Sequence, residues 1–105
     1  MWYGVSLLYR SMISPTQPRD VLWEESIVLV EAGSEQDARH QAERLGLLGN
    51  HGYGSESGHV EWKFERVERI YPIDAAEVGS GTEVFSRFLR DSEVKSLLTP
   101  FDDRD

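Results

Sequence analysis

The sequence predicts an α+β domain: an antiparallel sheet of about three strands with two helices on one face, in the order strand, strand, helix, strand, helix. Two segments, residues 2–10 and 59–65, alternate apolar and polar side chains with the period of a strand. Two others, which begin at Ser34 and Ser80, repeat apolar residues at helical spacing behind a capping signal. Because the chain shows no internal repeat and no linker, these elements predict one ββαβα unit.

The first two strands are expected to form an antiparallel hairpin. In residues 2–10, alternation places four side chains on the core face: Tyr3, Val5, Leu7 and Tyr9. Pro15 and Pro18 prevent strand pairing, so residues 11–20 are expected to be a loop. From Val21 the chain is again rich in apolar residues on both parities, which predicts a central strand covered on both faces.

A helix is predicted over residues 34–45. The Ser34 hydroxyl can accept a hydrogen bond from the backbone N–H of Asp37, whose carboxylate interacts favourably with the helix dipole. The expected buried stripe has three members at helical spacing: Ala38, Ala42 and Leu45. Gly46 is the expected end of the helix, because glycine tolerates the left-handed conformation that is common there.

Residues 46–58 contain five of the nine glycines and are predicted to be a mobile loop. The following strand, 59–65, places three side chains inward: Val60, Trp62 and Phe64. After Phe64 the apolar phase slips, and a bulge near Glu65 and Arg66 would return the later apolar residues to the buried face. Those later residues are Val67, Tyr71 and Ile73. Pro72 is expected to close the strand.

A second helix is predicted to begin at Ser80, which has the spacing of a capping box with Glu83. Four apolar residues follow at helical spacing: Val84, Phe85, Phe88 and Leu89. Three further apolar residues either extend this helix or form another turn: Val94, Leu97 and Leu98. Pro100 ends the helix, because the residue before a proline avoids the helical conformation. The acidic residues from about 100 onward are expected to be a frayed end.

Composition predicts a single domain over residues 1–105. The chain has 11 basic and 19 acidic side chains and a formal net charge of -8. This charge repels phosphate backbones and anionic lipid, so nucleic acids and membranes are disfavoured as partners. The sequence has no cysteine, no apolar run that approaches the roughly 18 residues of a membrane span, and no secretion-signal pattern at its start. These features predict a cytoplasmic protein.

Four segments carry a recognisable pattern of strand residues and helix caps: WYGVSLLY at the start, ESIVLVEAGSEQDARHQAERLG in the middle, HVEWKFERVERIYPI, and GTEVFSRFLR. In these segments the chain resembles a family of small, uncharacterised bacterial proteins that is defined as a domain of unknown function. The resemblance covers most of residues 2–90. It implies one compact domain in a bacterial cytoplasm, and it implies no activity, cofactor or catalytic residue.

Polar side chains in and beside the glycine-rich loop form a first candidate site, which contains His51, Tyr53 and His59. Imidazoles beside a carboxylate such as Glu56 could ligate a metal or transfer protons. However, two histidines eight residues apart are an incomplete ligand set, and the glycines neither follow a strand nor open a helix as in a phosphate-binding loop. Solvated loop residues are the alternative interpretation. We therefore predict no metal and no cofactor.

A second candidate site consists of four arginines: Arg66, Arg69, Arg87 and Arg90. Beside Tyr71 and Phe88, these guanidinium groups could hold a carboxylate of a ligand or of a peptide. Alternatively, they pair with the surplus acidic residues on the surface, which is common and contributes little to stability.

These observations favour a non-enzymatic protein that binds another protein or a second copy of itself. No nucleophile, base or metal-ligand set has the spacing that catalysis needs, and the acidic charge would speed association with a basic partner. The alternative is a small enzyme or ligand-binding protein that uses the glycine-rich residues 49–59. A concave pocket that holds His51, Tyr53 and His59 would favour this alternative, whereas a flat aromatic or acidic patch would favour the interaction protein.

Overall fold

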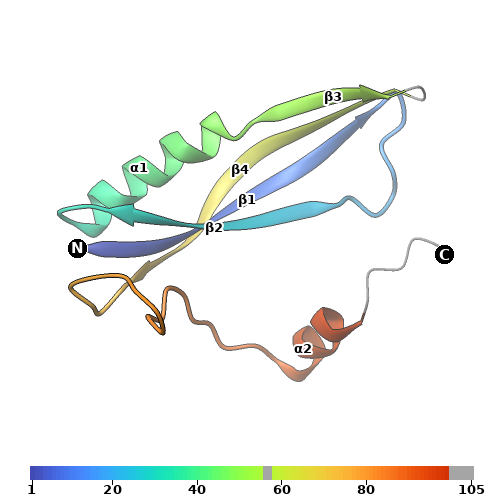
Figure 1. The fold of residues 1–105 in the computed structure, drawn as a ribbon. Helices are drawn as coiled ribbons and strands as arrows, with labels where there is room; N and C mark the ends of the chain where they lie inside the picture. The colour runs from blue at the N-terminus through green and yellow to red at the C-terminus, as the bar shows by residue number, and fades with distance from the viewer. Residues whose placement is uncertain (56–57, 100–105) are drawn as a thin grey trace.

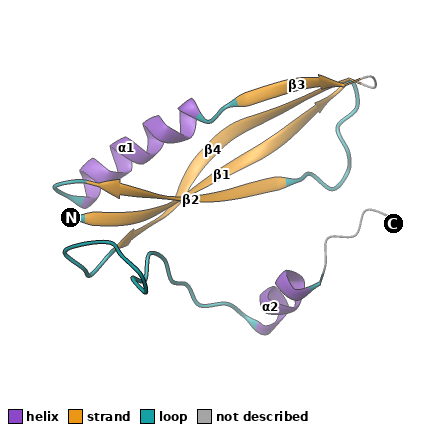
Figure 2. Ribbon diagram, viewed as in Figure 1, coloured by secondary structure: helices purple, strands orange, loops and turns teal. Residues whose placement is uncertain are grey.

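A computed structural model describes residues 1–55 and 58–99, and it has an α+β fold with a four-stranded antiparallel sheet (Figures 1 and 2). The elements in chain order are β1 (Trp2–Ser14), β2 (Trp23–Glu31), α1 (Glu35–Leu48), β3 (His51–Ser55), β4 (Gly58–Pro72) and α2 (Asp91–Leu98). The strand order in the sheet is β2-β1-β4-β3. The predicted class is therefore confirmed, and the predicted number of about three strands is wrong because β3 is an additional strand.

β1 is one of the two central strands and supplies half of the buried core cluster of the described chain. Its four predicted core residues, Tyr3, Val5, Leu7 and Tyr9, are all buried, and they cluster with Val30, Ala38 and Ala42. β1 pairs with β2 on one side, as the predicted hairpin requires, and with β4 on the other. β2 is consequently an edge strand, so the prediction of a central strand after Val21 is wrong. The reason is that β4, not β2, fills the second central position beside β1.

α1 packs on the sheet through small residues. Ser34 accepts a hydrogen bond from the Asp37 N–H at 3.1 Å, as predicted, and the buried positions are Ala38, Ala42 and Gly46. Leu45 is 41% exposed, so its predicted place on the buried stripe is wrong. Gly46 does not end the helix, which continues to Leu48. A Cβ at Gly46 would collide with the Phe64 ring, so glycine is needed there for close approach of the helix to β4.

The predicted loop over residues 46–58 is wrong for its described part. The chain is helical to Leu48 and then forms β3, which pairs antiparallel with β4 through Gly52 and Gly54. A Cβ at Gly52 would lie 3.0 Å from the imidazole of His59, so glycine here gives room to a side chain of the paired strand. Close strand packing therefore explains Gly52 better than backbone freedom does. Residues 56 and 57 lie outside the described residues.

β4 carries two register shifts against β1. One lies opposite Leu8 and Tyr9, where Glu65 has no partner, and this confirms the bulge predicted near Glu65 and Arg66. The other lies opposite Ser6 and Leu7, and the sequence pattern did not predict it. The two shifts keep three residues packed against the core: Phe64, Val67 and Ile70. Tyr71 is then on the opposite face, where it contacts Phe85, so its predicted inward position is wrong.

The chain after β4 crosses the sheet face opposite α1. We call residues 74–90 the strap; they form no helix and no strand. The helix predicted from Ser80 is therefore wrong, because contacts of Val84 and Phe85 with the sheet override the local capping signal. α2 begins only at Asp91, and it packs against no other helix or strand of the described chain. The two helices do not share one face of the sheet, contrary to the prediction (Figure 1).

The molecule is more extended than a typical domain of its length. Its radius of gyration is 16.5 Å, whereas a compact domain of this size has about 13 Å. It exposes 8003 Å² of surface, against about 6,000 Å² for a compact monomer of 12.0 kDa. The fold thus leaves more surface open than its chain length requires.

Candidate interaction surface

The strap crosses the sheet over Gly4 of β1. A Cβ on Gly4 would lie 1.9 Å from the carbonyl oxygen of Val84, so only glycine lets the strap come this close. Next to this crossing, the ring of Phe85 lies 6.0 Å from the ring of Tyr71, centroid to centroid. The Arg69 guanidinium lies 6.0 Å from the centre of the Phe85 ring. Residues from β1 and β4 thus form the seat of the strap.

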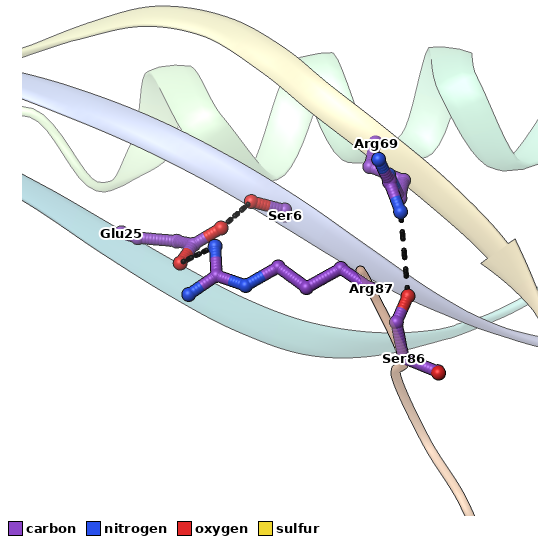
Figure 3. A network of polar contacts seen from close by, with 5 residues as sticks. All are labelled: Ser6, Glu25, Arg69, Ser86 and Arg87. Atoms are coloured by element: carbon purple, nitrogen blue, oxygen red, sulfur yellow. Dashed lines mark hydrogen bonds and ion pairs between the residues drawn. The ribbon is translucent and has the colours of Figure 1, made fainter. Parts of the chain in front are cut away.

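Polar contacts also tie the strap to the sheet (Figure 3). The Glu25 carboxylate of β2 accepts a hydrogen bond from the buried Ser6 hydroxyl at 2.6 Å and forms an ion pair with Arg87 of the strap at 3.3 Å. Arg69 of β4 donates to the backbone carbonyl of Ser86 at 3.3 Å. Because Glu25 is engaged from β1 and from the strap, it is the main polar link between the two layers.

Glu83 of the strap acts on Tyr71 as well. Burial, and after it a hydrogen bond and the charge of Glu83, raise the pKa of the Tyr71 phenol above its ordinary value of 10.0. On the α1 side, burial and then the Glu24 charge raise the pKa of Tyr9, whose hydroxyl donates to the Gly46 carbonyl at 2.9 Å. Both phenols therefore stay protonated at neutral pH and serve as hydrogen-bond donors.

A hollow of about 340 Å³ lies where the strap leaves the sheet, and we call it the strap hollow. Its lining residues come from β1, β2, β4, the strap and α2: Leu8, Glu25, Glu68, Arg69, Arg87, Phe88, Leu89 and Glu93. Three carboxylates thus face two guanidinium groups. Within the described chain, Glu68 has no ion pair and no hydrogen bond through its side chain, and Phe88 is fully exposed. The hollow combines a free carboxylate with apolar surface, which suits a cationic side chain.

The structure divides the four predicted arginines. Arg69 and Arg87 come together in the strap hollow, where Glu25 already pairs with Arg87. Arg66 lines a different hollow, beside residues of α1, and Arg90 precedes the first turn of α2. Of the four arginines, Arg87 alone forms an ion pair with an acid of the described chain, and Arg69 donates to a backbone carbonyl instead.

The histidine candidates also occupy separate places. Directly opposed residues of paired strands share a face, and the β3–β4 register opposes His51 to Trp62 and Tyr53 to Val60. His59 is opposed to Gly54 and so lies on the other face, where it borders a hollow of about 360 Å³ beside Arg10. No group of three metal-ligating side chains occurs in the part of the chain that the structure describes.

The outer face of β2 is a feature that the sequence analysis missed. Trp23, Ile27 and Leu29 lie on the sheet face opposite α1 and are 47%, 43% and 41% exposed. The three residues are all odd-numbered, so the alternation in the sequence already placed them on one face of β2. The sequence instead predicted a central strand, because a strand that is apolar on both faces usually lies in the centre of a sheet.

Comparison with known proteins places the chain in a family. A family model described as Domain of unknown function (DUF4288) matches residues 2–86. The chain belongs to this family. The DUF4288 match includes the whole sheet, α1 and the part of the strap that seats on Gly4, and it ends before α2. No curated protein and no solved structure matches the chain.

No helix in residues 1–55 and 58–99 is long and apolar enough to cross a lipid bilayer.

Proposed function

We propose that this DUF4288 domain is a non-enzymatic protein-interaction module and that its partner is a protein with a basic surface segment. The observation that carries this proposal is the strap hollow, whose lining includes the Glu68 carboxylate, unpaired within the described chain, and the exposed ring of Phe88. A lysine or arginine of the partner would place its charged end at Glu68. Its methylene groups would lie against Phe88 and Leu8.

The charges of the whole domain support a basic partner. The net charge is -8, and among the described acidic residues only Glu25 and Asp91 form ion pairs. Unpaired carboxylates steer a positive surface toward the domain and raise the rate of association. The same charge repels nucleic acids and anionic membranes, so neither is part of this proposal.

The enzyme alternative has less support. It requires His51, Tyr53 and His59 to converge, and the β3–β4 register puts His59 on the face opposite the other two. A histidine pair that cannot reach one substrate atom cannot share acid and base roles on it.

Binding measurements on a purified partner test the proposal. Affinity capture with the full chain at low salt supplies candidates, and each is then purified and titrated against the domain. We expect one basic protein to bind, with an affinity that falls as salt rises, because screening acts over a Debye length of roughly 8 Å at physiological ionic strength. We expect Glu68→Gln to weaken this binding, since it removes the free carboxylate of the hollow.

Glu35→Gln is the matched control, because it removes the same charge from the exposed first turn of α1. Equal losses for Glu68→Gln and Glu35→Gln would reject the strap hollow as the site. Turnover of a small molecule without a protein partner, or retention of nucleic acid at physiological salt, would overturn the proposed function.

A further inference from the structure

The two edges of the sheet differ in how well they resist pairing with another strand. The β3 edge is short, with five residues that include Gly52 and Gly54. The β2 edge has nine residues, no lysine, arginine or proline, and no break in its register with β1. Proteins protect exposed edges with short strands, prolines, bulges or charged side chains, and β2 has charges only near its two ends, at Glu24, Glu25 and Glu31. β2 is therefore the edge that is open to another strand.

The phase of the β1–β2 ladder shows which backbone groups of β2 are free. Met1 and Ala32 exchange two backbone hydrogen bonds, at 3.1 and 2.9 Å, and the Ser11 N–H donates to the Leu22 carbonyl at 3.0 Å. Hydrogen-bonded pairs alternate along an antiparallel ladder, so the even-numbered residues of β2 bond to β1. The odd-numbered residues turn their N–H and C=O groups away from the sheet: Trp23, Glu25, Ile27, Leu29 and Glu31.

These outward groups are almost all unsatisfied by the described residues. Within residues 1–55 and 58–99, only the Glu31 carbonyl of this group has a partner, since it accepts a hydrogen bond from the Gln41 amide at 3.0 Å. The five residues whose backbone groups point away from the sheet are centred on Ile27, with two of them on each side. An antiparallel strand that is paired about Ile27 would therefore satisfy the free groups of Glu25, Ile27 and Leu29 together.

From this geometry we infer that β2 pairs with β2 of a second copy of the chain, antiparallel and with the two-fold axis at Ile27. In this register Ile27 opposes the Ile27 of the copy, and Glu25 opposes its Leu29. No glutamate opposes a glutamate, and the two copies of Glu25 lie about 14 Å apart along the strands, beyond the roughly 8 Å Debye length at physiological ionic strength.

Side chains favour the same register. Ile27 and Leu29 project from one sheet face and are each more than 40% exposed in the single chain. Pairing about Ile27 would bring Ile27 and Leu29 of one copy next to Ile27 and Leu29 of the other, and these four side chains would form one continuous apolar patch. Such isologous contacts, in which the same residues act from both sides, close into a dimer and do not extend into a fibre.

Single cysteine variants test the register, because the chain has no cysteine of its own. In the proposed dimer the two Cα atoms at position 27 lie about 5.5 Å apart, within the range that a disulfide spans. We expect Ile27→Cys to form a covalent dimer on mild oxidation of the full chain. Leu29→Cys is the matched control; it lies on the same strand face with nearly equal exposure, but its two copies are about 14 Å apart.

The oligomeric state of the unmodified chain gives an independent test. Light scattering should show a dimer whose share increases with salt, because salt screens the repulsion between two chains of net charge -8. Ile27→Lys should abolish the dimer, and Leu48→Lys, on the exposed side of α1, should leave it intact. Circular dichroism serves to check that both variants fold.

Two results would overturn the inference. One is cross-linking that is equal for Ile27→Cys and Leu29→Cys, or absent from both. The other is a monomer at every salt and protein concentration tested. The proposed function is judged separately, because binding of a basic partner depends on Glu68 and weakens with salt, whereas the dimer depends on Ile27 and strengthens with salt.

Discussion

The two faces of the sheet are covered in different ways. On one face, α1 approaches closely through Ala38, Ala42 and Gly46, all of them buried. On the other face, the strap has no helix or strand and is held by the Phe85 ring, the Arg87 ion pair and a few hydrogen bonds. The first cover buries a continuous apolar core, while the second rests on half-buried rings and solvent-accessible charges.

Because the two faces are covered differently, we expect the α1 face to determine folding and the rest of the sheet to be available for binding. Burial of apolar surface supplies most of the free energy of folding, so the α1 face should determine whether the sheet forms. Exposed ion pairs contribute little, so the strap can move or exchange contacts without unfolding the domain. The surfaces that we propose for partners, the strap hollow and the β2 edge, both lie outside the α1 face.

The largest loss of stability is expected from Leu7→Ala, on the α1 face. Leu7 is 3% exposed in the centre of β1, and truncation of such a residue costs about 2–5 kcal/mol. Denaturant unfolding measures this loss, with Leu48→Ala as the control on the exposed side of α1. A loss below 1 kcal/mol would contradict the assignment of the core to this face.

Ala42→Leu should have the next largest effect. Ala42 is completely buried between α1 and the sheet, and the added side chain must displace the helix or the β1 side chains. Overpacking of this kind costs about 1–3 kcal/mol. Arg44→Leu, at an exposed position of α1, is the control in the same unfolding experiment. Equal stability of both variants would show that α1 packs less closely than described.

Gly4→Ala should act on the strap face alone. The new methyl group would collide with the Val84 carbonyl, so the strap must move away from Gly4 while the sheet and α1 stay folded. The NMR signals of residues 84–88 should shift while those of α1 stay unchanged, and the free energy of unfolding should fall by only about 1 kcal/mol. Gly33→Ala is the control, because its nearest neighbouring atom is 3.9 Å away. Unchanged signals from the strap would contradict this account.

The sequence predicted the elements whose local pattern agrees with their tertiary surroundings. The core residues of β1, the Ser34 cap and the Ala38–Ala42 stripe were all predicted correctly, because alternation, capping and helical spacing indicate the same structure. The bulge at Glu65 was visible for the same reason, as a slip in an otherwise regular pattern.

The errors arose where a long-range contact decides the conformation. Gly46 resembles a helix end, but it lies inside α1 because Phe64, from another strand, packs against it. Ser80 and Glu83 resemble a capping box, but the next residues are held on Gly4 and Tyr71 of the sheet. The candidate site was hard to predict for the same reason: Glu25, Arg69 and Arg87 come from three segments that no local spacing relates.

The smallest effect is expected from pH at the strap face, through Tyr71. Its pKa in the folded chain is raised above 10.0, mainly by burial and then by Glu83, so the fold favours the protonated phenol. The contribution of Tyr71 is therefore complete below about pH 10 and is lost as the pH rises through the raised pKa. In the unmodified chain, the ring proton signals of Phe85, which contacts Tyr71, should shift in NMR spectra above pH 10. Tyr71→Phe should remove that shift, whereas Tyr9→Phe should leave it, because the Tyr9 hydroxyl bonds to Gly46 on the α1 face. A Phe85 shift that persists in Tyr71→Phe would show that another group loosens the strap at high pH.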